Sequence, residues 1–142
     1  MAQCVCFCDR ALSPCLPKDG IRWESGNSGM LCAISPSAAE QLITRPLYFQ
    51  TLLVPEGIYS PAWQARQVVS CGLSAHSSLT LSSMDGRDML CIQRSLADRS
   101  GHIVEPQELL LPAAWGAFPP ADRLLLAGIW LYWSGSLPDC DS

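Results

Sequence analysis

The chain has 142 residues, of which 49% are apolar and only 15% are charged. A disordered chain combines low hydrophobicity with high net charge, so this composition rules out disorder and predicts one folded domain. The formal net charge of −4 at pH 7 argues against a general nucleic-acid-binding surface.

Residues 1–20 contain four of the eight cysteines, and they show no sustained periodicity. We expect an irregular arm or one short edge strand here, and an extended strand would place Cys4, Cys6 and Cys8 on one face about 7 Å apart. Together with Cys15 they predict a soft-metal site or a redox-sensitive segment. The alternative is burial as small apolar side chains, which the absence of any Cys-x-x-Cys spacing favours.

The next two elements are a hairpin and a short helix. Alternation in Ile21–Glu24, turn residues at 25–29 and the apolar run Met30–Ile34 predict two antiparallel strands. The sequence Ser37-Ala-Ala-Glu40 is a capping box, in which the hydroxyl and carboxylate satisfy exposed backbone N–H groups. We therefore expect a helix of about two turns that ends before Pro46.

Short β-forming runs separated by turn residues fill the middle of the chain. The clearest hairpin signal is a pair of runs on either side of an Asp-Gly turn. The expected strands are Leu47–Val54, Gln67–Val69, Leu79–Ser82, Leu90–Ile92 and Ile103–Val104, with Glu108–Leu111 as a strand or one helical turn.

The most hydrophobic window is Leu124–Trp133, which is apolar all round and therefore ambiguous between strand and helix. Its aromatic content and its central glycine favour a strand or two short strands, with a helix as the alternative. The window is shorter than the roughly 20 residues that span a bilayer, so we expect no direct membrane insertion.

Turn signals that recur about every 8–12 residues predict a β-rich α+β fold. The expected architecture is a compact antiparallel sandwich or barrel with one or two short helices. We place an irregular Cys-rich N-terminal arm at 1–20, a single globular domain at 21–136 and a polar tail at 137–142.

Residues that could support catalysis are scattered along the chain. Cys71 and His76 are close in sequence, but nucleophilic catalysis also needs an orienting partner, and no carboxylate lies within eight residues of His76 in the sequence. Glycine-rich phosphate loops are absent from the sequence. We therefore expect a protein that is not an enzyme and needs no cofactor.

Five tryptophans are many for this length. On a terminal strand, Trp130 and Trp133 would point to opposite faces, so one could be exposed. Exposed tryptophans often anchor interfaces, which makes Trp130, Trp133 and Trp63 candidate interaction residues. The alternative is that each simply fills the core.

The segment Leu73–Leu81, followed by an Asp-Gly turn, resembles the middle of a forkhead-associated domain, and Asp122–Leu131 is similar to that family's closing strands. The resemblance over 65–133 implies a degenerate β-sandwich, as in the cytoplasmic docking platforms of bacterial type III secretion rings. The family's Ser-x-x-His is one residue shorter here, at Ser74-x-His76, and its Gly-Arg and Asn-Gly are missing. The resemblance therefore does not imply phosphothreonine binding.

The sequence as a whole predicts a non-enzymatic protein–protein interaction module, such as an adaptor, chaperone, inhibitor or assembly component. We expect another protein or self-association as the partner and no nucleic acid. No export signal is recognisable, so we expect a cytoplasmic protein with reduced thiols. The alternatives are a metal-binding or redox-sensitive protein using the N-terminal cysteines, and a small-molecule-binding β-barrel.

Overall fold

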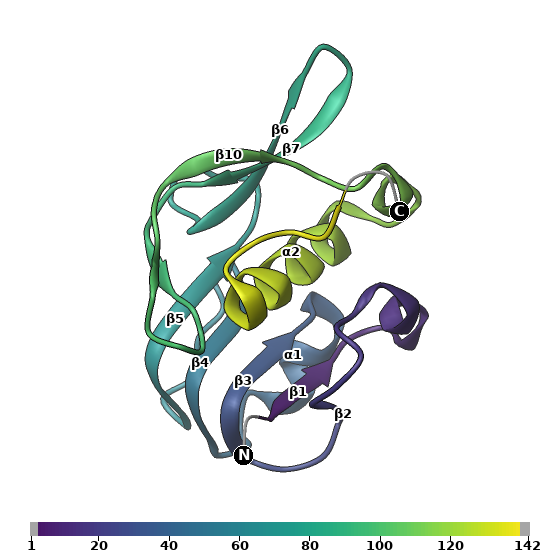
Figure 1. Ribbon diagram of the computed structural model, residues 1–142. Coiled ribbons are helices and arrows are strands. Elements are labelled where there is room, and N and C mark those ends of the chain that lie inside the picture. The colour runs from purple at the N-terminus through teal and green to yellow at the C-terminus, as the bar shows by residue number, and fades with distance from the viewer. Residues whose placement is uncertain (1–2, 140–142) are drawn as a thin grey trace.

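The computed structural model describes residues 3–139. Its main element is an eight-stranded mixed sheet in the order β10-β7-β6-β5-β4-β3-β1-β2 (Figure 1). The strands of this sheet are β1 (Cys4–Phe7), β2 (Ile21–Trp23), β3 (Ser28–Ile34), β4 (Leu47–Pro55), β5 (Trp63–Cys71), β6 (Leu79–Met84), β7 (Arg87–Ile92) and β10 (Gln107–Leu110). Neighbours from β2 to β6 are parallel, whereas β6, β7 and β10 are antiparallel. A separate two-stranded hairpin joins β8 (Leu96–Ala97) to β9 (Ile103–Val104).

Helices cover both faces of this sheet. The long helix α2 (Pro120–Ser134) packs on one face and the short helix α1 (Pro36–Leu42) on the other, and we call these the α2 face and the α1 face. Two 3₁₀ helices, η1 (Arg10–Cys15) and η2 (Ala113–Ala117), complete the chain. Parallel strands that are covered on both faces are apolar on both, and β3 follows this rule from Leu31 to Ile34.

The prediction of a β-rich α+β protein is confirmed, but the sheet is largely parallel and is not an antiparallel sandwich. Turn residues mark the ends of strands correctly, yet only some turns are hairpins. Antiparallel hairpins form between β6 and β7 and between β8 and β9. The connections from β1 to β6 instead lead to parallel strands, and local turn signals do not distinguish the two kinds of connection.

The N-terminal segment is the largest departure from expectation. Cys4–Phe7 is neither irregular nor at the edge, because β1 lies between β3 and β2 and is parallel to both. The hairpin predicted over residues 21–34 is therefore wrong: β2 and β3 are separated by β1 and do not pair. All four residues of β1 are buried. Non-local pairing, rather than local periodicity, makes this segment a strand.

Helix α1 forms where the sequence predicts a two-turn helix, but it begins two residues earlier. The N-cap is Ser35, whose Oγ accepts a hydrogen bond from the Ala38 amide at 3.3 Å. Pro36 occupies the first helical turn, where its missing N–H costs nothing. Ser37 instead hydrogen-bonds the Ser35 hydroxyl at 3.1 Å.

The expectation that Leu124–Trp133 is a strand is wrong, because the window lies within α2. Gly128 marks a close approach of helix and sheet rather than a kink in a strand. A Cβ atom built at Gly128 would lie 2.9 Å from both terminal methyl groups of Leu53 on β4. The helix is apolar all round because eight of its residues are buried.

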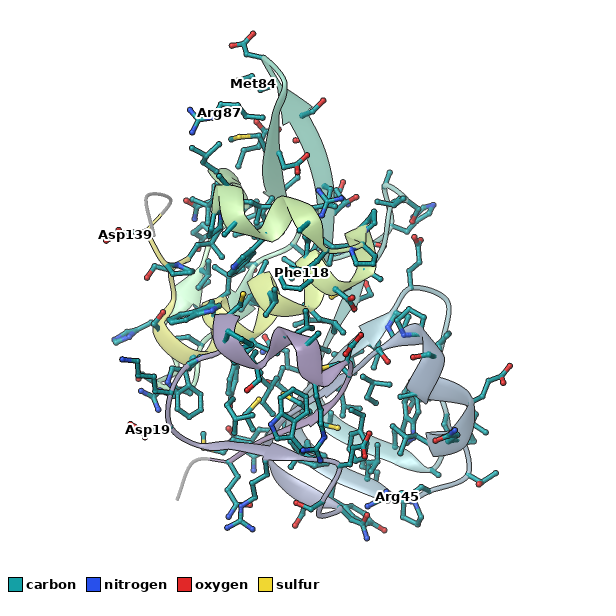
Figure 2. The ribbon with its side chains drawn as sticks, turned by 90° about the vertical axis from the view of Figure 1, so that its right-hand side faces the viewer. Asp19, Arg45, Met84, Arg87, Phe118 and Asp139 are labelled. Atoms are coloured by element: carbon teal, nitrogen blue, oxygen red, sulfur yellow. The ribbon has the colours of Figure 1, made fainter. Side chains whose placement is uncertain are left out.

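The remaining predicted elements are confirmed. The turn between β6 and β7 has Asp85 at φ 54° and Gly86 at φ 77°, the positive values that a two-residue hairpin turn requires. This hairpin projects from the rest of the molecule, with Met84 and Arg87 near its tip (Figure 2). Within the part of the chain described, no helix is long and apolar enough to cross a membrane.

Candidate functional site: a polar groove over β4 and β5

In β3, β4 and β5 the side chains stop alternating between the two faces of the sheet at neighbouring positions. Backbone pairing between these strands is regular before and after Met30, Gln50 and Arg66, but these three residues are not paired with one another. Phe49, just before the break, packs in the core of the α1 face. Both residues that follow it, Gln50 and Thr51, line a pocket on the other face of the sheet. The break thus places consecutive polar side chains on one side.

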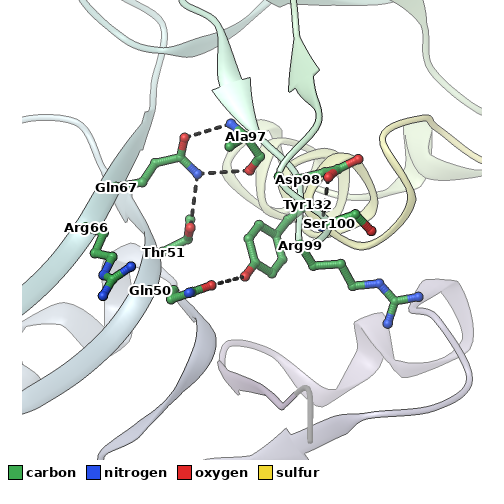
Figure 3. Close-up of a pocket in the computed structure, with 10 residues that line it drawn as sticks. Gln50, Thr51, Arg66, Gln67, Ala97, Asp98, Arg99, Ser100 and Tyr132 are labelled. Atoms are coloured by element: carbon green, nitrogen blue, oxygen red, sulfur yellow. Dashed lines mark hydrogen bonds between the residues drawn. The ribbon is translucent and has the colours of Figure 1, made fainter.

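The pocket has a volume of about 480 Å³ and is open on its outer side. Four segments build it: β4, β5, the turn of the β8–β9 hairpin and the C-terminal end of α2 (Figure 3). Its lining residues are Gln50, Thr51, Arg66, Gln67, Ala97, Asp98, Arg99, Ser100, Gly101 and Tyr132.

Gln67 attaches the β8–β9 hairpin to the sheet. Its Oε1 accepts a hydrogen bond from the Ala97 amide at 2.8 Å, and its Nε2 donates to the Ala97 carbonyl at 3.1 Å. The same Nε2 donates to Thr51 Oγ1 at 3.0 Å. One side chain therefore satisfies both backbone groups of Ala97 and fixes one wall of the pocket.

Asp98 organises the turn that forms the opposite wall. Its Oδ1 accepts hydrogen bonds from the amides of Ser100 at 2.9 Å and His102 at 3.0 Å. The Arg99 amide donates to the Tyr132 carbonyl at 2.8 Å, which ties the turn to α2. The carboxylate in this pocket is thus engaged by the backbone of its own turn.

The two cations of the pocket are Arg66 and Arg99. The Arg99 guanidinium lies over the Trp133 ring, 4.1 Å from its centroid, an arrangement that orients the group while it keeps its charge. Among residues 3–139, the side-chain ion pairs are His102–Asp98 and Arg123–Asp88. Neither arginine of the pocket is therefore paired with a carboxylate in the described structure.

Tyr132 supplies a neutral hydroxyl to the same pocket. Its hydroxyl donates a hydrogen bond to Gln50 Oε1 at 3.4 Å. Burial raises the pKa of Tyr132 above its usual value, so the side chain stays protonated at neutral pH. The guanidinium groups of the pocket and the side-chain amide of Gln50 remain as donors suited to a carboxylate or phosphate oxygen.

A second pocket of about 440 Å³ continues from the first toward the start of β4 and β5. The two pockets share Gln50 and Arg66. Tyr48 and Gln64, which pair with each other in the ladder, line its far part beside Gly29. We call the two pockets together the β4–β5 groove.

The cysteines predicted to bind metal lie elsewhere. Cys4, Cys6 and Cys8 belong to the core under α2, with the Sγ atoms of Cys4 and Cys6 3.9 Å apart. Cys15 is partly buried beside this core. No group of three or more His, Cys, Asp or Glu side chains in the described chain is arranged to hold a metal ion. A neighbouring thiol and burial raise the pKa of Cys6, as expected for protonated thiols in a core.

The three candidate tryptophans have different environments. Trp63 is 1% exposed and donates from Nε1 to the Leu42 carbonyl at 2.8 Å, so we do not propose it as an interaction residue. Trp130 donates to the Cys15 carbonyl at 2.8 Å. Since the window is helical, Trp130 and Trp133 lie about one turn apart on the same side and not on opposite faces.

The segments that resemble a forkhead-associated domain are not two parts of a sandwich here. Leu73–Ser78 is a loop that leads into β6, and Asp122–Leu131 lies within α2. The fold therefore lends the resemblance no support.

The groove residues were not identified from the sequence. Arg66-Gln67 and Gln50-Thr51 are adjacent polar pairs within predicted or neighbouring strand regions, and that pairing is the one signal of a break in alternation. Arg99 belongs to a turn more than 30 residues away, and no local pattern links it to them.

No protein-family model matches the chain, and no curated protein or solved structure is significantly similar to it. The geometry of the β4–β5 groove is therefore the basis for a functional proposal.

Proposed function

We propose that the protein is a non-enzymatic interaction module that binds an acidic segment of a partner protein in the β4–β5 groove. The observation that carries the proposal is that two arginines, Arg66 and Arg99, line one open pocket on opposite sides of the Gln50–Tyr132 pair, and neither has a carboxylate partner in the described chain (Figure 3). Guanidinium groups bind carboxylate and phosphate groups through paired, charge-assisted hydrogen bonds.

The groove is suited to binding rather than to covalent chemistry. Its side chains are arginines, glutamines, hydroxyl groups, aromatic rings and one carboxylate, and Asp98 uses that carboxylate to hold its own turn. Nucleophilic catalysis pairs a nucleophile with an adjacent general base. The lining residues include neither cysteine nor histidine.

The shape of the groove favours a peptide segment over a small molecule. Pockets for small molecules enclose most of the ligand surface. Here two open pockets follow one another along β4 and β5, which gives an elongated surface. The chain as a whole carries a net charge of −4, so the groove is a local basic site on an acidic protein.

Peptide titration tests this proposal. Acidic, neutral and basic peptides of equal length are titrated into ¹⁵N-labelled protein, and we expect shifts at groove residues with the acidic peptides alone. Since a hydrogen bond to a charged group contributes about 1.5–3 kcal/mol, Arg66→Gln and Arg99→Gln should each weaken binding about tenfold or more. Arg22→Gln, at an exposed position on β2, is the matched control and should leave binding unchanged.

Two results would contradict the proposal. One is equal binding of neutral and acidic peptides. The other is unchanged affinity in the Arg66→Gln, Arg99→Gln double variant.

A further inference from the structure

Tyr48 stands at the far end of the β4–β5 groove from the Arg99 turn. Its side chain is 52% exposed although it lies on a central strand of the sheet. The ring contacts recorded between residues 3 and 139 do not include Tyr48, and its hydroxyl makes no hydrogen bond with the described chain. A large ring is thus presented to solvent beside a polar groove.

The position of Tyr48 relative to the arginines follows from the strand geometry. Tyr48 precedes Gln50 by two residues on β4, and its ladder partner Gln64 precedes Arg66 by two residues on β5. Residues two apart in a strand share a face and are separated by about 7 Å. The aromatic ring and the guanidinium group of Arg66 therefore lie on the same side of the sheet, one strand repeat apart.

We propose that the groove recognises two features of its ligand: an acidic residue at Arg66, and a large apolar or aromatic residue, two positions away, at Tyr48. This inference rests on the proposed binding of an acidic segment and specifies that segment. The partner sequence would contain an acidic residue, any residue, and then an aromatic or large aliphatic residue, or the same order reversed.

The spacing requires the ligand to bind in an extended conformation. In an extended segment, side chains at i and i+2 point the same way about 7 Å apart, which matches the repeat of β4 and β5. In a helix, the neighbouring pairs on one face are i, i+3 and i, i+4 instead. Gln64 lies beside Tyr48 and Gln50 lies at the level of Arg66, so a side-chain amide at each end can bond the ligand backbone.

Tyr59 provides a natural comparison, because it is also exposed but lies outside the groove. It lines a separate pocket with Ile43 and Ile58, beside α1. The Tyr59 ring meets Trp63 edge-on at 6.4 Å between centroids. No arginine lines that pocket, so Tyr59 should play no part in recognising an acidic segment.

The test uses a set of peptides with a glutamate at the central position. Each peptide carries a single phenylalanine, and its position varies from four residues before the glutamate to four residues after it. Because an aromatic pair adds about 0.5–1.5 kcal/mol, the best spacing should improve affinity by roughly threefold to tenfold over an alanine peptide. We expect that maximum at two residues. Tyr48→Ser should abolish the preference while charge-dependent binding remains, whereas Tyr48→Phe and Tyr59→Ser should preserve it.

The outcomes separate the two proposals. If no acidic peptide binds, the proposed function fails. If acidic peptides bind through Arg66 and Arg99 with no preferred phenylalanine position, or if Tyr48→Ser keeps the preference, the two-feature recognition alone is overturned. A maximum at three or four residues would also overturn it, because it would indicate a helical ligand.

Discussion

Cysteine is used in this protein chiefly as a small core residue. Cys4, Cys6 and Cys8 lie under α2, Cys32 lies on the α1 face, and Cys71 is buried near the end of β5. Burial raises the pKa of Cys71 to about 12, so its thiol stays protonated at any physiological pH. Reactivity requires the thiolate and access to solvent, and the buried Cys71 has neither. The Sγ atoms of Cys4 and Cys6 lie 3.9 Å apart, closer than the strand repeat of about 7 Å, because the two side chains pack together under α2.

Residues around the groove act by holding one another in place. Trp133 was a candidate for contact with a partner, but its ring supports the Arg99 guanidinium. Its other neighbour is Gly20, where an added Cβ would lie 2.3 Å from the ring. The N-terminal segment, α2 and the β8–β9 hairpin therefore meet at this ring, and Trp133 orients the Arg99 guanidinium.

Glu56 gives a pH dependence that can be tested at a single residue. Its carboxylate accepts a bond from the Ser74 hydroxyl and, at Oε1, bonds from the amides of Leu73 at 2.7 Å and Ser74 at 3.3 Å. These bonds lower the pKa of Glu56 below its ordinary value. A carboxyl with a lower pKa in the folded state stabilises the loop fully above the unfolded pKa, which is about 4.3, and loses that effect as the pH falls through the folded value.

We therefore expect the Leu73 amide resonance to shift in an NMR titration with a midpoint below about 4.3. The amide of this loop should also exchange with solvent faster once Glu56 is protonated. Glu56→Gln is the control, since it keeps an acceptor oxygen but cannot titrate. A Leu73 shift that persists in this variant, or a wild-type midpoint above the ordinary glutamate pKa, would show that Glu56 does not hold the loop.

At the scale of elements, Gly128 determines how closely α2 packs on the sheet. Added side-chain atoms would meet the two methyl groups of Leu53 at 2.9 Å and one methyl group of Leu79 at 3.3 Å. Overpacking of this kind typically costs about 1–3 kcal/mol, so Gly128→Val should lower the free energy of unfolding by that amount. Denaturant unfolding monitored by circular dichroism measures it.

Gly116→Val is the matched control for this change, because a Cβ at Gly116 meets no atom within 4 Å. It should alter stability by less than about 0.5 kcal/mol, the usual range for a surface substitution. If Gly128→Val proved as stable as the wild type, α2 would not be packed against β4 at this distance.

Elements whose signals are local were predictable, and those set by distant contacts were not. The β6–β7 hairpin can be predicted because the dipeptide Asp85-Gly86 favours a two-residue turn without help from distant residues. Residues 4–7 become a strand because β2 and β3 supply partners on both sides. Leu124–Trp133 is a helix because a largely parallel sheet needs a covering layer, and an all-round apolar pattern fits either element.

The groove was beyond sequence reasoning for the same reason. Arg66 and Arg99 line one pocket only after the β8–β9 hairpin folds back over β5, where Gln67 holds Ala97 by two hydrogen bonds. The break in alternation at Gln50 and Arg66 is a property of three strands in register. An alternating pattern followed along β4 or β5 alone would place one residue of each consecutive polar pair, Gln50-Thr51 and Arg66-Gln67, on the α1 face.

At the scale of the whole molecule, the order of the sheet makes the first strand integral to the core. β1 separates β2 from the rest of the sheet and contributes buried side chains to both faces, with Cys4 and Cys6 under α2 and Val5 and Phe7 on the α1 face. The segment before it also pairs, because the Gln3 carbonyl accepts bonds from the amides of Met30 and Leu31, each at 3.1 Å. A dispensable arm would have none of these contacts.

Deletion of residues 1–8 should therefore abolish cooperative unfolding, because it removes a strand that is paired on both sides and exposes the cores of both faces at once. The measurement is a thermal or denaturant transition followed by circular dichroism and tryptophan fluorescence.

A milder form of the same test is Val5→Ala, which should lower the free energy of unfolding by about 1–3 kcal/mol since Val5 is fully buried. The control for the deletion is a variant that lacks residues Met84 and Arg87, which pair with each other near the tip of the β6–β7 hairpin. Its unfolding transition should be nearly the same as that of the wild type. A truncated chain that still melted cooperatively near the wild-type temperature would mean that β3 is a sufficient edge and that the N-terminal strand is an accessory to the fold.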